Sequence, residues 1–121
     1  MKRRLLALAA ALAVAATPVL AATPNDGFAA FWPTFAAAAG KDDQATLKQL
    51  VQLDPSIVGS FAQAHALYFK PAQRKCLAKA HPDRDVDQTG QVNYGVFCGN
   101  LIYVFTKTTA GWRLTDLSPD D

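Results

Sequence analysis

Few side chains in this 121-residue chain could take part in catalysis. All ten acidic residues are aspartates, and the histidines are His65 and His81. A histidine that acts as a general base needs a second group to orient it, and the spacing of the sequence selects no partner for His65. This residue falls near the apolar side of an expected helix, so a place in the core and a place in a cleft both account for it. His81 falls at a helix end, where a cation offsets the negative pole.

Nucleophilic residues give little support for an enzyme. Ser56, Ser60 and Ser118 lie outside any Gly-x-Ser-x-Gly turn. Cys76 and Cys98 form an even, isolated pair, which in an oxidising compartment predicts a structural disulfide. Metal sites generally need more ligands at closer spacing, and a redox pair is generally two residues apart. We therefore predict a disulfide that closes a loop of about 23 residues, and neither a catalytic residue nor a cofactor.

Residues 83–90 carry three aspartates at alternate positions, which could direct carboxylate oxygens at a hard cation. Counted from Asp85, the order partly resembles a calcium loop, but Val96 stands where the closing bidentate Glu is needed. A solvated loop between a helix and a strand explains the same composition. We favour the loop and predict no metal site, with cation binding by Asp83–Gly90 as the alternative.

A basic cluster lies just before this loop. On a helix, its members form two ridges whose residues are one turn apart. The cluster is either a solvated outer face or a docking surface for an anionic partner. Its residues are Lys70, Arg74, Lys75, Lys79 and Arg84.

Residues 1–21 have the pattern of a cleavable signal peptide. Three basic residues precede the apolar run Leu5–Ala16, and Thr17-Pro18 breaks that run before a cleavage site near Ala21. A membrane-spanning helix needs about 20 apolar residues, so we expect no stable membrane anchor. The protein is therefore predicted to be periplasmic or secreted.

Cleavage changes the charge of the protein. Removal of three of the 12 Lys and Arg residues leaves nine against ten aspartates, a net charge of −1. This balance argues against nucleic acid as a partner. The remaining residues 22–121 are enough for one domain.

Apolar residues recur at helical spacing in the first part of this domain. Phe28, Phe31, Trp32 and Phe35 share one face of a helix that Gly40 should end. Pro33 lies within this run, so we expect the helix to begin near Phe31 or to bend at Trp32. Three further helices are predicted: one that Asp42 or Asp43 caps, one at residues 55–68 that Asp54 caps, and one at residues 71–80.

The period becomes two after the loop at residues 83–90. Residues 91–98, 101–106 and 112–117 are expected strands, with turns at Gly99-Asn100 and at Thr108–Gly111. The first strand alternates Val92, Tyr94, Val96 and Cys98 with Asn93, Gly95, Phe97 and Gly99. Helices followed by a meander predict an α+β fold, with the helices packed on about three antiparallel strands and one helix–strand disulfide.

Several packing motifs resemble small periplasmic members of the nuclear transport factor two-like (SnoaL-like, cystatin-like) domains. They are the aromatic first helix with the break at Gly40–Asp43, the run Tyr68–Pro71 with Arg74 after it, and the ending Gly111–Leu114. The resemblance implies helices on a bent sheet around a conical pocket, although only three strands are expected here. That family includes enzymes, ligand carriers and interaction modules, so the resemblance does not choose a function.

We expect a non-catalytic domain that binds a small ligand or a protein. The concavity between helices and sheet is the candidate site, with His65, Tyr68, Tyr94 and Tyr103 as its lining. An enzyme that uses His65 as general base is one alternative. The other is a protein–protein module, such as an inhibitor of a secreted hydrolase. The sequence leaves the oligomeric state open.

Overall fold

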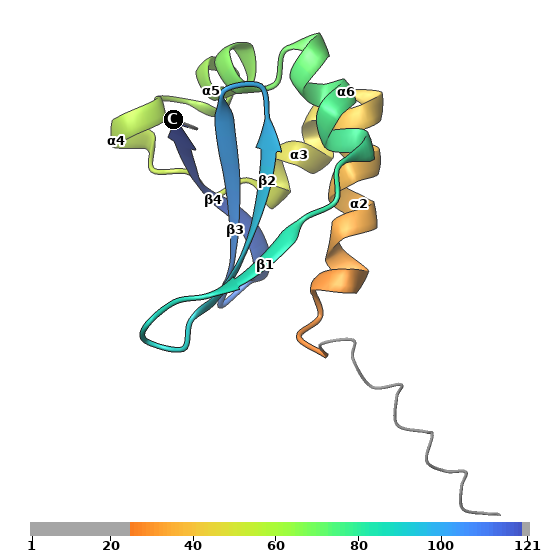
Figure 1. The fold of residues 1–121 in the computed structure, drawn as a ribbon. Coiled ribbons are helices and arrows are strands. Elements are labelled where there is room, and N and C mark those ends of the chain that lie inside the picture. Colours follow the sequence, from red (N-terminus) through yellow and green to blue (C-terminus); the bar gives the residue numbers. More distant parts are fainter. Residues whose placement is uncertain (1–24, 120–121) are drawn as a thin grey trace, which may run out of the picture.

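The computed structural model describes residues 25–119, and the predicted signal peptide lies outside the described residues. Helices come first along this part of the chain, and one antiparallel sheet follows (Figure 1). The helices are α2 (Phe28–Lys41), α3 (Gln44–Leu50), α4 (Pro55–Val58), α5 (Phe61–Tyr68) and α6 (Pro71–Lys79). The strands pair in chain order as β1 (Asp83–Val86), β2 (Val92–Cys98), β3 (Leu101–Thr108) and β4 (Gly111–Pro119). The predicted α+β fold is confirmed.

Helix α2 begins at Phe28 and contains Pro33 in its interior. Proline has no N–H for the carbonyl of Ala29, one turn earlier. Both residues are exposed, so water can hydrate that carbonyl. Gly40 does not end the helix, because α2 continues to Lys41 and the left-handed residue is Asp42, with φ 55°.

Gly40 instead allows α2 and α6 to approach each other. A Cβ atom at this position would lie 3.1 Å from the Cβ of Ala78, which is tighter than ordinary contact. A glycine at a helix crossing therefore sets the distance between these two helices.

The helix predicted at residues 55–68 is two helices, which is a correction. Gly59 has φ 80° and ψ −153°, a conformation that side chains disfavour, and it separates α4 from α5. Ser60 and Gln63 then form a reciprocal capping box at the start of α5. Ile57, in the short helix α4, is 79% exposed.

The segment expected as a loop at residues 83–90 contains the strand β1, so the sheet has four strands rather than three within the described residues. All four residues of β1 are exposed. A strand without a buried face has no period-two pattern of apolar residues, which explains the wrong prediction. Its register on β2 runs from Asp83 opposite Gly95 to Val86 opposite Val92.

The core lies between the helices and one face of the sheet, with Phe105 of β3 at its centre. This fully buried ring meets four rings of α2 edge-on, at centroid distances of 4.9 to 6.0 Å. They are the aromatic residues that the sequence predicts on one helical face, Phe28, Phe31, Trp32 and Phe35. Aromatic pairs of this geometry stabilise beyond the area that they bury.

A β-bulge in the pairing of β3 with β4 lets the last strand contribute to the same core. Its register with β3 shifts between Val104 and Phe105, and this bulge brings Leu117 back to the face that carries Leu114. Val51, just after α3, forms a parallel bridge with Leu114 and so covers part of the outer edge of β4. An edge that is covered in this way is less open to pairing with another chain.

We expect Phe105→Ala to lower the free energy of unfolding by about 3–5 kcal/mol, because the cavity removes packing from four aromatic rings. Phe97→Ala is the matched control: it makes the same chemical change at a ring that is 53% exposed. Urea denaturation of both variants measures the difference. Equal losses in the two variants would contradict this view of the core.

Candidate functional site

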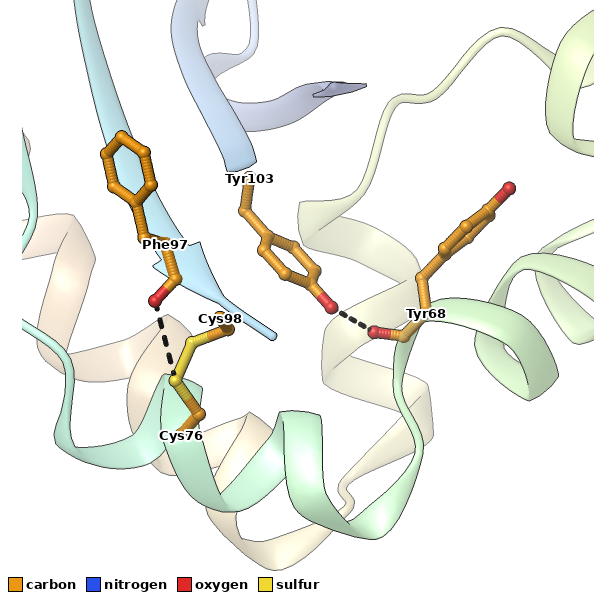
Figure 2. The surroundings of a disulfide bond; sticks show 5 residues. All are labelled: Tyr68, Cys76, Phe97, Cys98 and Tyr103. Carbon is orange, nitrogen blue, oxygen red and sulfur yellow. Dashed lines mark hydrogen bonds between the residues drawn. A yellow bond between two sulfur atoms is a disulfide. The ribbon is translucent and has the colours of Figure 1, made fainter. Parts of the chain in front are cut away.

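The four side chains predicted to line a central cleft do not surround a common cavity among the described residues. Tyr103 is fully buried, and its hydroxyl donates to the backbone carbonyl of Tyr68 (Figure 2). Figure 2 shows the ring of Tyr68 turned away from Tyr103, and it lines a separate surface hollow with α4 and β4. Tyr94 is also buried, and its ring stacks on Phe28 with centroids 3.7 Å apart. Side chains thus fill the space between helices and sheet.

Tyr94 belongs to a polar cluster around Asp26, just before α2. Its hydroxyl donates to Asp26 Oδ2 at 2.7 Å, the N–H of Phe28 donates to Oδ1 at 3.0 Å, and Arg84 Nε lies 3.6 Å from Oδ2. The indole of Trp112 donates to the Asp26 carbonyl at 2.8 Å. Burial acts to raise the pKa of Asp26, but the hydrogen bonds to its carboxylate and the charge of Arg84 outweigh it and hold that pKa below its ordinary value. The cluster joins the start of α2 to the sheet, which is a structural role.

His65 lies in a second polar cluster, at the other end of α2. Its Nε2 is 2.7 Å from Asp42 Oδ1, and Arg74 Nε lies 3.6 Å from the same oxygen. Arg74 Nη1 also donates to the carbonyl of Phe69 at 2.8 Å. The hydrogen bond from His65 is the main cause that lowers the pKa of Asp42. Asp42 is therefore the carboxylate partner of His65 that sequence spacing did not reveal.

An Asp–His pair can orient an imidazole for proton transfer. Here the His65 ring also stacks on Phe69, with centroids 5.9 Å apart and planes 12° apart. His65 lines none of the five best-formed surface hollows among residues 25–119. The contacts that the structure does show join α2, α5 and α6 through Asp42, His65 and Arg74, hereafter the Asp42 clasp.

A groove of about 610 Å³ lies between α6 and the end of β2, hereafter the α6–β2 groove. Its volume falls in the range typical of binding sites. The residues that define it are Lys75 and Lys79 of α6, His81 and Asp83 of the following segment, and Val96 and Phe97 of β2. The Phe97 side chain is 53% exposed, although it is a large apolar group.

The Cys76–Cys98 disulfide holds the two walls of this groove together and confirms the predicted pairing, with a Cα–Cα distance of 5.8 Å (Figure 2). Cys76 Sγ also lies 3.6 Å from the carbonyl oxygen of Phe97. This is a contact rather than a hydrogen bond, because an oxidised sulfur carries no proton. The bond is compatible with an oxidising compartment.

The structure divides the predicted basic cluster. Arg74 faces Asp42 and Arg84 faces Asp26, whereas Lys75 and Lys79 form no salt bridge with the described residues. Both lysines line the α6–β2 groove, one turn apart on α6. The groove therefore combines two available cations with one exposed aromatic ring.

Sequence reasoning did not select Phe97, although the alternation along β2 placed it opposite the core face. Its sheet face carries Asp83 and Asp85 of β1 beside Gly95, Ile102 and Val104.

Asp87 is engaged in its own turn, where it accepts hydrogen bonds from Thr89 and Gln91. Among residues 25–119, no three metal-ligating side chains come close enough to hold a metal ion.

Comparison of the chain with protein-family models, curated proteins and solved structures finds no match. No helix within the described residues is both long and apolar enough to cross a membrane. What bears on function is thus the geometry of these residues.

The pairing of Asp42 predicts how stability depends on pH. An aspartate whose pKa is lowered by folding contributes stability above its unfolded-state pKa of about 3.9, and this is lost as the pH falls through the folded value. We expect Asp42→Asn to flatten the loss of stability below about pH 4, as measured by urea denaturation at a series of pH values. Asp85→Asn removes the same charge from an exposed position and serves as control. Parallel curves for wild type and Asp42→Asn would rule out the clasp.

The disulfide predicts a second effect. Reduction restores the chain entropy of the loop in the unfolded state, so we expect it to lower the free energy of unfolding by about 3 kcal/mol. The measurement is urea denaturation with and without a phosphine reductant, with Cys76→Ala/Cys98→Ala as the variant that should not respond. An unchanged midpoint with two titratable thiols would show that the bond adds no stability.

Proposed function

We propose that this chain is an exported, non-catalytic domain that binds a partner protein through the α6–β2 groove. The observation that carries this proposal is the exposure of Phe97 in a groove that Lys75 and Lys79 also line, in a domain whose other aromatic rings pack mainly in the core. Aromatic residues, phenylalanine among them, are enriched in protein–protein interfaces relative to the rest of the surface. When a partner covers a large apolar side chain that faces water, the burial lowers the free energy of the complex.

The charge of the groove indicates what kind of partner fits. Lys75 and Lys79 have no counter-ion among the described residues, and His81 lies on the same side. The carboxylate of Asp83 also lines the groove, so two lysines and one aspartate leave its lining with one net positive charge when His81 is neutral. Complementary potentials favour specific encounter, and we infer that the partner presents carboxylates to the groove.

The predicted signal peptide and the disulfide support the exported location in this proposal. The predicted signal peptide directs the chain to the periplasm or the exterior, and the Cys76–Cys98 disulfide would persist there. The resemblance to nuclear transport factor two-like domains is consistent with a binding role, because that family includes interaction modules. Inhibition of a secreted hydrolase is one form that such binding would take.

Partner binding fits the geometry better than the two alternatives from the sequence. A small-ligand carrier needs an enclosed site, and the interior near Tyr103 is closed by packing. An enzyme that uses His65 needs substrate access to an imidazole that instead joins Asp42 and stacks on Phe69. An activity that depends on His65 stays a prediction from the sequence alone.

A photo-crosslinking amino acid at position 97 tests the proposal in the native cell envelope. Leu67 is the matched control, because its side chain is also 53% exposed but lies on α5. We expect a discrete adduct from position 97, none from position 67, and a weaker adduct when Lys75→Glu/Lys79→Glu is combined with the probe. Absence of an adduct at 97, or equal labelling from both positions, would refute docking through this groove.

A further inference from the structure

Strand β2 extends further than the strand beside it. β1 begins with Asp83 opposite Gly95, whereas β2 continues to Cys98. The last residues of β2 therefore have β3 on one side and no strand on the other. Among the described residues, no backbone hydrogen bond joins Phe97 to residues 80–82, where β1 would otherwise continue.

The hairpin geometry shows which way the backbone of Phe97 points. Cys98 and Leu101 close the two-residue turn that has Gly99 at φ 68°, so they form the hydrogen-bonded pair next to the turn. Bonding alternates along an antiparallel strand, so the N–H and C=O of Phe97 point away from β3. The contact between Cys76 Sγ and the Phe97 carbonyl oxygen, on the α6 side, agrees with this direction.

A strand edge with an unpaired donor and acceptor therefore lines the α6–β2 groove, and the arrangement of a helix beside an open edge suits strand addition. Resting on the proposed function, we propose that the partner inserts an extended peptide segment into this groove. The segment pairs with Phe97 as an added antiparallel strand.

Alternation of side chains defines the sequence pattern of that segment. The residue directly opposite Phe97 projects on the same sheet face as the Phe97 ring, where an apolar side chain covers it. Its two neighbours project to the other face, toward α6, where Lys75 and Lys79 lie. The segment thus reads acidic–apolar–acidic, with each carboxylate facing a lysine.

The probe for this proposal is the peptide acetyl-Gly-Glu-Val-Glu-Gly-amide, titrated into the ¹⁵N-labelled mature protein and followed by amide NMR shifts. We expect saturable shifts centred on Phe97. Methylation of the valine nitrogen removes the donor to the Phe97 carbonyl and should weaken binding about tenfold. The Lys-Val-Lys analogue should bind only after Lys75→Glu/Lys79→Glu, and Lys48→Glu, the same charge change on α3, should leave the glutamate peptide unaffected.

The outcomes separate this inference from the proposed function. Equal binding of the methylated and unmethylated peptides would overturn strand addition while leaving an acidic partner in the groove. No binding of any peptide, together with a crosslink at position 97, would overturn the peptide and retain partner docking. A crosslink whose mass corresponds to two copies of this chain would identify a second copy as occupant and also overturn the proposal.

Discussion

The covalent bond between Cys76 and Cys98 joins the last helix to the end of the first long strand. This attachment holds the helical wall of the α6–β2 groove beside the strand that forms its other wall. The same helix crosses α2 closely at Gly40, so α6 is held from two directions. A helix held in this way can stand beside a strand edge without closing onto it. The groove therefore has a rigid wall, and a rigid wall reduces the entropy that a partner would otherwise lose on binding.

Polar clusters at the two ends of α2 complement this attachment. Asp26 gathers Tyr94, Arg84 and the N–H of Phe28 at the start of the helix, and Asp42 gathers His65 and Arg74 at its end. Each cluster connects segments that lie far apart in the sequence. Since both carboxylates have hydrogen-bonding partners, their charged forms are favoured by folding, as their lowered pKa values indicate. These two carboxylates hold the ends of α2 against the sheet and against α5 and α6.

Most aromatic residues of the domain build its core, whereas Phe97 is exposed on the surface. Phe105 and the four rings of α2 form one cluster, and Tyr103 is fully buried in the same core. Phe97 alternates to the opposite side of the sheet, beside the carboxylates of Asp83 and Asp85 and at the rim of a lysine-lined groove. A small domain with a filled core has its exterior available for recognition. This is the physical basis for favouring a partner over an enclosed ligand.

The sequence by itself determined the elements whose signals are local. Helical spacing identified the aromatic face of α2, period-two alternation identified β2, and a β-branched and aromatic run identified β3. The isolated cysteine pair identified the disulfide. The sequence did not determine β1, because a strand exposed on both faces has no apolar pattern, nor the break at Gly59, which depends on one backbone conformation. The pairing of His65 with Asp42, and the groove at Phe97, were decided only by the tertiary structure. Both bring together residues more than 20 positions apart, whose proximity arises from packing and is not written in any local spacing.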